Sequence, residues 1–436
     1  MMYIDNLLFA IILVLGIGFF AKNVKKLRRN IKLGQDVNRS DNPSVRWKNM
    51  AMIALGQSKM IKRPIAGFLH VIVYAGFIII NLEVLEIIID GLFGTHRIFS
   101  NYIGSFYSFL IGSFEILAVL VLVAVIVFWF RRNIIKLKRF VGSDLIGAPK
   151  QDADIILYFE IVLMSLFLIM NATDLHFQMM NSGNVISQFI TPLFYDMDIT
   201  TVEIVERCVW WLHIVGILIF LNYLYYSKHL HILLAFPNTY FADLNSKGKF
   251  DNLESVTKEV KLMMDPNADP FAAQPVDDNA IPTKFGASDV QDLNWVQLLN
   301  AYTCTECGRC TSSCPANQTG KKLSPRKIMM DTRDRLEEVG RNIDTNKGVF
   351  VPDNKSLLND YISTEELWAC TSCNACVEEC PVNISPLSII MDMRRYLVME
   401  QSAAPQSLNA MMTNIENNGA PWQYNQQDRL NWKEEK

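Results

Sequence analysis

The sequence has no excess of charge of either sign. Its 436 residues include 41 lysines and arginines against 44 aspartates and glutamates, which gives a formal net charge of −3. This balance does not indicate a nucleic-acid partner, since proteins that bind nucleic acid usually carry a basic surplus. The pair Gly16-x-Gly18 lies inside an apolar run, without the strand that precedes a dinucleotide-binding loop. No flavin, nicotinamide or phosphate-binding motif is therefore indicated.

Cysteine is scarce, and eight of the nine cysteines belong to one pattern, C-x2-C-x2-C-x3-C-P, which occurs twice. In bacterial two-cluster ferredoxins, three close thiolates of such a run bind one 4Fe-4S cluster and the fourth binds the other cluster. We therefore expect two ligand sets. The first cysteine set, for cluster 1, is Cys304, Cys307, Cys310 and Cys380, and the second cysteine set, for cluster 2, is Cys370, Cys373, Cys376 and Cys314.

Two other uses of these cysteines are less consistent with the pattern. Structural zinc sites use C-x2-C pairs, but they do not need a third and fourth cysteine followed by proline in each half. A disulfide framework is disfavoured because the cysteines are crowded and lie in a segment that we expect in the cytoplasm.

Apolar residues make up half of the chain, and almost all of them precede residue 236 or so. Five apolar runs are long enough to cross the ~30 Å hydrocarbon layer of a bilayer. These predicted spans are residues 4–21, 65–89, 103–130, 155–171 and 205–226. The first run lacks the basic start and the small-residue cleavage site of a signal peptide, so we expect a retained span.

Lysine and arginine placement predicts the orientation of these spans. Basic residues follow the first span (Lys22 to Lys32), the third span (Arg131 to Arg139) and the fifth span (Lys228), whereas the opposite loops contain only Arg97. Short cytoplasmic loops are enriched in lysine and arginine. We therefore expect a multi-pass protein of the inner (cytoplasmic) membrane, with the N-terminus outside and the iron-sulfur part in the cytoplasm.

The expected fold class is all-α, with a five-helix transmembrane bundle (residues 1–236) followed by a helical dicluster ferredoxin domain (residues 291–402). Residues 237–290 predict a polar linker, with one helix at Leu253–Met264 and a proline-rich piece, Pro266–Pro282. Residues 403–436 are rich in asparagine and glutamine and predict an extended tail. Within the ferredoxin domain, Ser324-Pro325 and Ser385-Pro386 are typical helix starts.

Four histidines of the membrane part are candidate ligands of haem b: His70, His213, His229 and His231. Ionisable residues inside a membrane are costly and usually functional, and imidazole is a haem axial ligand. His213 and His231 are 18 residues, or about five helical turns, apart, so we expect them on one helix face about 27 Å apart, as two stacked haems would require. His70 should face His231 or His229.

Each of these assignments has a simpler alternative. A lone histidine can be a polar group at a helix contact, and the only partners near His213 are His176 and His96. Glu83, Glu86, Glu115 and Glu160 could relay protons to a quinone or could make contacts between helices. Lys228 and His229 could bind haem propionates or a quinone, or could mark the membrane edge.

The stretch from His213-Ile-Val-Gly-Ile to His229-Leu-His231, with Gly67-Phe-Leu-His70, resembles the cytochrome b (gamma) subunit of respiratory nitrate reductase. That family has five spans, an outside N-terminus and two b haems that link quinol to cytoplasmic iron-sulfur clusters. The resemblance implies that His70 and His231 bind an inner haem and that His213 binds one side of an outer haem. The family's second histidine of span two falls at about Ile80 here, a departure that affects the outer haem.

The fusion of such a cytochrome to a helical dicluster ferredoxin, with Ser385-Pro386 and Met393-Arg-Arg-Tyr396, resembles the membrane oxidoreductases related to heterodisulfide reductase and to electron-transfer-flavoprotein:quinone enzymes. Those systems also carry a domain with adjacent cysteines. No Cys-Cys pair occurs here. The resemblance therefore implies a cytoplasmic partner subunit with that paired-cysteine iron-sulfur domain, a flavoprotein partner, or both.

Together these patterns predict a membrane-bound electron-transfer subunit of an oxidoreductase. It would link cytoplasmic redox partners to the quinone pool, with menaquinone as the expected quinone, through two 4Fe-4S clusters and one or two b haems. The alternative is a membrane-anchored ferredoxin that reduces a metal or assists cofactor assembly and holds no haem.

Overall fold

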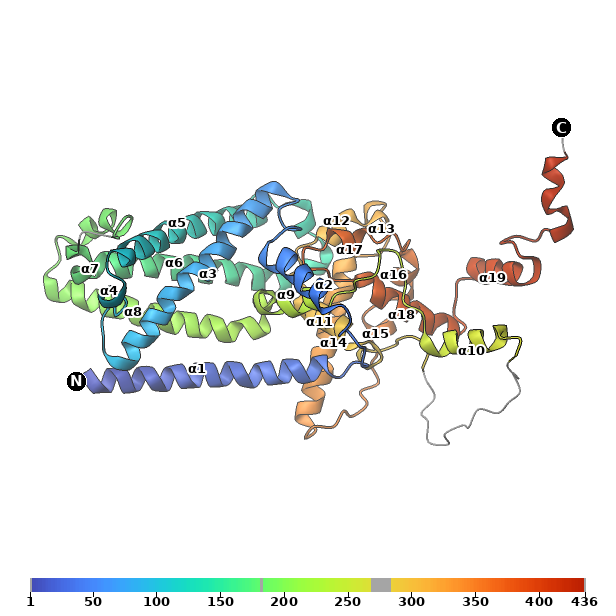
Figure 1. Cartoon of the computed structure of the whole chain (residues 1–436), viewed down its shortest axis with the longest axis horizontal. Helices are drawn as coiled ribbons and strands as arrows, with labels where there is room; N and C mark the ends of the chain where they lie inside the picture. The colour runs from blue at the N-terminus through green and yellow to red at the C-terminus, as the bar shows by residue number, and fades with distance from the viewer. Residues whose placement is uncertain (1, 181–182, 268–283, 435–436) are drawn as a thin grey trace.

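Five long helices form a bundle that makes up one end of the molecule (Figure 1). The computed structural model describes residues 2–180, 183–267 and 284–434. The bundle consists of α1 (Met2–Ile31), α3 (Pro64–Phe93), α5 (Ser105–Asn133), α6 (Ala148–Thr173) and α8 (Ile199–Tyr223). All five are long and apolar enough to cross a membrane, as the sequence predicted. Three of them, α1, α3 and α6, exceed the predicted runs at both ends.

The five helices form a closed ring. Helix α1 packs against α3 and α8, and the pairs α3 with α5, α5 with α6 and α6 with α8 complete it. Glycines allow close approach at two of these contacts, since a Cβ atom on Gly76 would lie 2.4 Å from Val121 and one on Gly216 would lie 2.9 Å from Leu163. Large apolar side chains such as Leu7 and Phe109 are exposed on the outer surface. The ring thus presents the apolar surface that a lipid environment requires.

Short elements connect the bundle helices on the side of the C-terminal domain. Helix α2 (Pro43–Met50) runs into the π-helix η1 (Ala51–Leu55), and 3-10 turns follow α5 at Lys138–Phe140 and Ser143–Leu145. Helix α9 (His231–Tyr240) packs against α2 and α11. These connections form the surface on which the C-terminal domain sits.

The C-terminal domain is a compact set of short helices around two cysteine loops. The helices are α11 (Trp295–Thr303), α12 (Arg309–Ser313), α13 (Pro315–Gln318), α14 (Pro325–Thr345), α15 (Leu357–Asp360), α16 (Thr364–Ala369), α17 (Ala375–Glu379) and α18 (Pro386–Met399). Both predicted Ser-Pro helix starts are confirmed, because Ser324 caps α14 and Ser385 caps α18 with a hydroxyl that accepts a backbone N–H. The described residues contain no β-strand, which confirms the all-α fold class.

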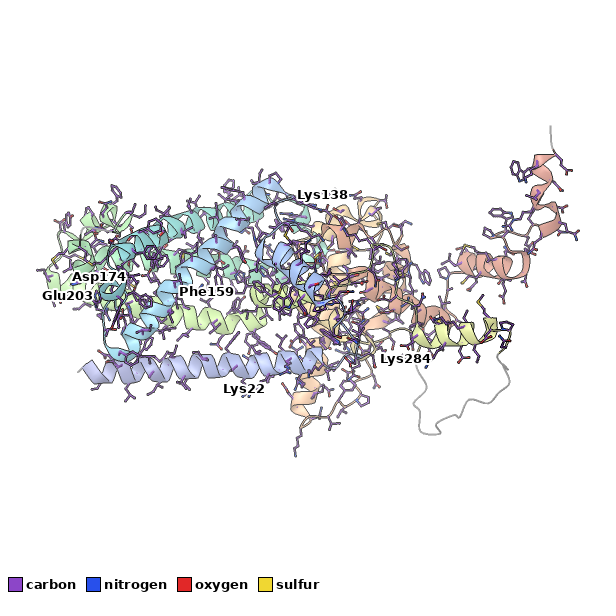
Figure 2. All side chains as sticks on the ribbon, in the orientation of Figure 1. Lys22, Lys138, Phe159, Asp174, Glu203 and Lys284 are labelled. Atoms are coloured by element: carbon purple, nitrogen blue, oxygen red, sulfur yellow. The ribbon has the colours of Figure 1, made fainter. Side chains whose placement is uncertain are left out.

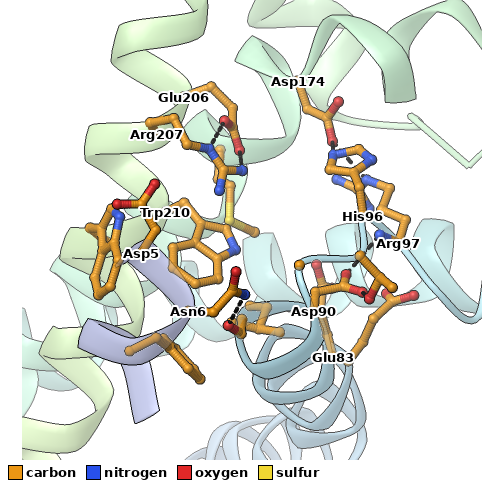
Figure 3. Close-up of a pocket in the computed structure, with 18 residues that line it drawn as sticks. Asp5, Asn6, Glu83, Asp90, His96, Arg97, Asp174, Glu206, Arg207 and Trp210 are labelled. Carbon is orange, nitrogen blue, oxygen red and sulfur yellow. Dashed lines mark hydrogen bonds and ion pairs between the residues drawn. The ribbon is translucent and has the colours of Figure 1, made fainter. Parts of the chain in front are cut away.

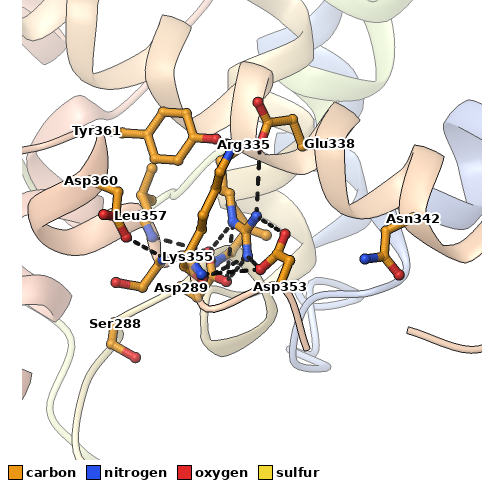
Figure 4. Close-up of polar contacts among 12 residues, drawn as sticks. Ser288, Asp289, Arg335, Glu338, Asn342, Asp353, Lys355, Leu357, Asp360 and Tyr361 are labelled. Carbon is orange, nitrogen blue, oxygen red and sulfur yellow. Dashed lines mark hydrogen bonds and ion pairs between the residues drawn. The ribbon is translucent and has the colours of Figure 1, made fainter. Parts of the chain in front are cut away.

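The domain begins before the predicted boundary at residue 291. Ala287 and Val290 are buried in its core, and Asp289 binds the fully buried Arg335 of α14 (Figure 4). Arg335 also donates to Asp353 at 2.6 Å and to the carbonyl of Lys355 at 2.8 Å. This arginine therefore ties the end of the linker and the stretch after α14 to one helix.

The linker contains helix α10 (Glu254–Met264), which confirms the predicted helix there. Most of the proline-rich piece, residues 268–282, lies outside the described residues. The tail differs from the extended segment that the sequence predicts, because helix α19 (Gln406–Asn418) and a 3-10 stretch, Gln426–Lys433, form within it. No residue of α19 is buried, and the tail projects away from the domain (Figure 1). A helix can form at Gln406–Asn418 because this stretch contains neither proline nor glycine, the two residues that disfavour a helix most.

Buried ion pairs fix the C-terminal domain to the bundle side. The guanidinium of Arg326 in α14 donates to both carboxylate oxygens of Asp144, at 2.5 and 2.9 Å. Lys228, directly before α9, pairs with Glu306 of the first cysteine loop. At the end of α1, Arg29 donates to the carbonyl of Gly340 at 3.0 Å. The cysteine loops are therefore held at a defined place against the end of the bundle.

Candidate functional site

The first cysteine set lines one pocket at the junction with the bundle. Cys304, Cys307 and Cys310 come from the first cysteine loop, and Cys380 comes from the end of the second loop. Helix α12 packs against α17, and this contact brings the two loops together. The structure thus places Cys380 with the first three cysteines of the other loop, as a crossed ligand arrangement requires.

The second cysteine set is also brought together. Burial raises the pKa of the Cys376 thiol to about 12, and the nearby thiols of Cys370, Cys314 and Cys373 add to that rise. Burial likewise raises the pKa of Cys304 to about 12. Thiolates, not thiols, bind iron, so loading of these sites must release protons.

Both cysteine loops contain residues with positive φ at the same two positions. In the first loop, Glu306 and Gly308 have positive φ values of 55° and 71°, and in the second loop Ser372 and Asn374 have values of 52° and 61°. These residues occupy matching positions between the cysteines. Left-handed backbone at two alternate positions curls each loop between its cysteines.

Backbone N–H groups donate hydrogen bonds to cysteine sulfur atoms in both sets. The N–H of Ile384 lies 3.2 Å from Sγ of Cys380, and the N–H of Ser372 lies 3.4 Å from Sγ of Cys370. Among the described residues, no three His, Cys, Asp or Glu side chains are close enough together to hold a single metal ion.

His70 and His231 face each other on the bundle side of the first cysteine set. Their ring centroids are 6.4 Å apart. A metal-imidazole bond is about 2.0–2.1 Å long, so the gap accommodates one metal atom between the rings. Nδ1 of His231 lies 3.2 Å from the carbonyl oxygen of Lys228, and Nδ1 of His70 is buried without a hydrogen-bond partner. The donor set therefore fits a bis-histidine haem iron.

The continuous helix assumed for His213 and His231 is wrong. Helix α8 ends at Tyr223 and a 3-10 turn ends at Tyr226. Ser227 is extended, with φ −114° and ψ 149°, and its hydroxyl accepts the N–H of His229. A new helical segment starts there, so His213 and His231 do not share a helix face. The break also turns His229 to within 5.3 Å of His231, between ring centroids.

His213 is buried and has no histidine opposite it. Its ring contacts Phe167 at a centroid distance of 6.1 Å. The partners considered for it pair elsewhere, since His96 and His176 contact each other at 5.4 Å and Nε2 of His96 lies 3.1 Å from Asp174. The structure therefore does not bring His176 or His96 to His213.

Three of the four acidic candidates make contacts within the bundle or its outer loops. Glu115 accepts hydrogen bonds from the backbone of Ile186 and Ser187, and Glu86 accepts from Phe99 N–H and from Tyr107. Glu160 lies 3.5 Å from Nε2 of His229. Glu83 differs, because one of its carboxylate oxygens is buried without a partner.

Glu83 faces a polar pocket at the outer end of the bundle (Figure 3). His96, Arg97 and Asp174 line one side, and Glu206, Arg207 and Trp210 line the other. Glu83 lies 13 residues after His70 on α3, or about 20 Å along the helix. The pocket is therefore remote from the histidine pair, and its buried ion pair between Arg97 and Asp174, at 2.7 Å, holds the outer loops together.

Sequence reasoning missed the residues that connect the histidine pair to the first cysteine set. Arg309, between two cysteines of the first loop, donates to the carbonyls of Lys59 and Met60 and to the sulfur of Met60. It also lies within electrostatic range of His70. Only its position inside the C-x2-C spacing could have drawn attention to it, because its partners are about 250 residues earlier in the chain.

Comparison with known proteins gives matches that agree with this site. The 4Fe-4S dicluster domain family matches residues 303–384. The chain is 30% identical, over 99% of its length, to the probable iron-sulfur-binding oxidoreductase FadF of Bacillus subtilis, of which it spans 61%. It is 25% identical, over 94% of its length, to the EtfAB:quinone oxidoreductase of Syntrophomonas wolfei, of which it spans 57%.

A third relative covers a smaller part. The chain is 33% identical, over 34% of its length, to a probable membrane-anchored ferredoxin of Chromohalobacter salexigens, of which it spans 24%. No solved structure matches significantly. The chain thus contains a 4Fe-4S dicluster domain and has iron-sulfur oxidoreductases as relatives, but it spans only about three fifths of the first two.

Proposed function

We propose that this chain is the membrane-bound electron-transfer part of an oxidoreductase that links a cytoplasmic redox partner to quinone in the membrane. One observation carries the proposal: Arg309 lines the pocket of the first cysteine set and lies within electrostatic range of His70, whose ring faces that of His231 at a centroid distance of 6.4 Å. Three candidate redox sites therefore follow one another from the C-terminal domain into the bundle.

Each site has the ligands its group needs. The two cysteine sets would each hold a 4Fe-4S cluster, and His70 and His231 would hold a b haem. These groups, when bound, take up and release one electron at a time. The carbonyl of Lys228 orients His231 through its Nδ1, which leaves Nε2 for iron. His229 belongs instead with Glu160, beside this pair.

The basic residues support the proposed orientation. Lys22 and Lys138 lie toward the end of the bundle that carries the C-terminal domain, whereas Asp174 and Glu203 lie at the opposite end (Figure 2). Because basic residues mark the cytoplasmic side, we place the N-terminus outside and the cysteine loops in the cytoplasm of an inner membrane.

The quinone and the soluble partner come from the relatives. One relative is named an EtfAB:quinone oxidoreductase, and others are subunits of heterodisulfide reductases. We therefore propose a membrane quinone, menaquinone in particular, as one redox partner. The other would be a flavoprotein or an iron-sulfur protein with a paired-cysteine domain.

The visible spectrum of the detergent-purified chain tests this proposal. We expect a broad iron-sulfur absorbance together with a b-type haem band that sharpens on reduction. His70→Ala should abolish the haem band and leave iron and acid-labile sulfide unchanged, because His70 belongs to neither cysteine set. His96→Ala, at the outer end, is the matched control and should keep the haem. A haem band that survives both His70→Ala and His231→Ala would refute the proposed ligands.

A second candidate function is a membrane-anchored ferredoxin without haem, acting in metal reduction or cofactor assembly. The relative of that name covers about a third of this chain and favours it. Brown protein with two clusters and no haem band would establish this second function over the first.

A further inference from the structure

We infer that electrons pass from cluster 2 to cluster 1 and then toward the bundle, because positive charge without a carboxylate partner is concentrated around the first cysteine set. The inference rests on the proposed function, which supplies the two clusters, and it adds a direction of flow. It also assigns a role in setting that direction to Lys59, Arg139 and Arg309.

These three cations lie beside the first cysteine set and bind only neutral groups among the described residues. Arg309 lines the pocket of that set, is buried, and donates to the carbonyls of Lys59 and Met60. The Lys59 ammonium donates to Asn383 at 2.9 Å and to the carbonyl of Val377 at 3.4 Å.

Arg139 approaches the first cysteine loop from the bundle side. Its carbonyl lies 3.0 Å from the position that a Cβ on Gly308 would take. Its guanidinium lies over the ring of Phe140, 4.8 Å from the centroid, and its Nε is buried without a hydrogen-bond partner. Its charge interacts with Cys307.

The other charged groups near the first cysteine set do not cancel the positive charge of Lys59, Arg139 and Arg309. Arg63 pairs with Glu379 at 2.9 Å, and Arg326 pairs with Asp144. Glu306 is shared by two cations, Lys228 and Arg333. Lys228 and Arg333 also pair with Asp152 and Asp334, so this last grouping carries one net negative charge and the other two are neutral. With the three cations added, the local sum remains positive.

Among the described residues, Arg394 is the cation whose charge acts on Cys370 of the second cysteine set. It donates to the carbonyls of Leu367 and Cys370 and lies over Trp368. The internal repeat provides a direct comparison. Arg309 of the first loop corresponds to Ala375 of the second loop, each directly before the third cysteine.

A reduced cluster carries one more negative charge than an oxidised one, so a nearby cation favours reduction. A unit charge about 8 Å away, at an effective dielectric constant of about 20, shifts the equilibrium about thirtyfold. Exposure to water also favours the reduced state, and Cys373 of the second set is exposed. Three cations, of which Arg309 is buried and Lys59 and Arg139 are half-buried, outweigh this effect against the single Arg394, since amide bonds to sulfur are similar in both sets.

The positions of the two cysteine sets favour the same order of electron transfer, from cluster 2 to cluster 1. The exposed Cys373 marks the side of the second cysteine set that a soluble protein can approach, whereas Arg309 of the first set donates to Lys59 and Met60, a few residues before α3 of the bundle. A reduced cytoplasmic carrier would give one electron to cluster 2, which passes it to oxidised cluster 1. Two such electrons, with two protons, reduce one quinone to quinol.

Redox titration of the full chain, followed by electron paramagnetic resonance, tests the inference. We expect two cluster signals of different midpoint potential. Lys59→Met and Arg309→Ala should each lower the higher midpoint potential, by about thirtyfold in equilibrium constant, which is about 90 mV for one electron at about 59 mV per tenfold. Lys59→Arg, the matched control, should keep the potential. Ala375→Arg should raise the lower potential instead.

The contrary results are distinct. If Lys59→Met and Arg309→Ala both shift the lower-potential signal, or neither shifts a signal, the inferred direction is wrong. Iron, acid-labile sulfide and haem are measured on the same samples. Two clusters with the wrong order of potentials therefore refute this inference alone, whereas a protein without clusters refutes the proposed function as well.

Discussion

The ion pair between Asp144 and Arg326 should determine how firmly the C-terminal domain is attached to the bundle. Asp144 is in the connection between α5 and α6, and Arg326 is in the first turn of α14. Arg326 is only 1% exposed. In Asp144→Ala, this guanidinium would keep one acceptor, the carbonyl of Arg139 at 2.7 Å.

The cost follows from an uncompensated buried charge. Removal of one partner of a buried ion pair destabilises a protein by about 3–5 kcal/mol, and the partial exposure of Asp144 places this case near the lower limit. A loss of about 3 kcal/mol corresponds to about 150-fold in the equilibrium for local opening. Asp144→Asn, which keeps an acceptor oxygen, should cost less.

Hydrogen exchange of the detergent-solubilised chain measures this opening. The reporter is the peptide that contains Leu145, whose buried side chain and N–H bond to the carbonyl of Gly142 protect it. Asp334→Ala is the control, because its exposed pair with Arg333 should contribute about 0–1 kcal/mol. If Asp144→Ala exchanges no faster than this control, the pair does not anchor the domain.

Three further changes should have measurable effects. Lys228→Met leaves Glu306 with Arg333 alone and should speed the release of iron from cluster 1 to a chelator severalfold. Gly340→Ala places a Cβ 2.5 Å from Asn30 of α1 and should destabilise the protein by about 1–3 kcal/mol. The measurement is the temperature at which visible absorbance is lost, which should fall. Gly18→Ala, with open space around it, should leave that temperature unchanged. Burial tends to raise the pKa of Asp174, but His96 and Arg97 outweigh burial and hold this pKa well below its usual range. Its contribution to stability should be complete above pH ~4, the unfolded pKa, and should decline at lower pH, so the thermal stabilities of wild type and Asp174→Asn, followed by circular dichroism, should converge there.

The features that local sequence determines could be predicted. Cysteine spacing indicated the dicluster domain because each loop brings three thiols together within seven residues, whatever the rest of the chain does. Apolar run length gave the five bundle helices for a similar reason, since a span must satisfy its own backbone hydrogen bonds. The capped Ser-Pro starts of α14 and α18 also depend on a few adjacent residues.

The rest depended on contacts that spacing does not show. Counting turns from His213 to His231 failed because Ser227 has the side chain and the extended backbone to start a new segment. The sequence predicted that His70 and His231 face each other, from their depth in the membrane. The only sign that no histidine lies opposite His213 was Ile80, which stands where the cytochrome b family has its second histidine of span two. Arg309 was not predicted, because its role depends on Lys59 and Met60, which fold against it from a distant part of the chain.

The attachment of α1 to the C-terminal domain has a consequence for biosynthesis. Gln35 exchanges backbone hydrogen bonds with Leu293 and Trp295, and Asn30 bonds the hydroxyl of Tyr302. These partners are about 260 residues later in the chain, so at 5–20 residues per second the ribosome needs roughly 13 to 50 s to produce them. During that interval Asn30 and Gln35 lack these partners, which makes the end of the first span a natural place for a chaperone to bind.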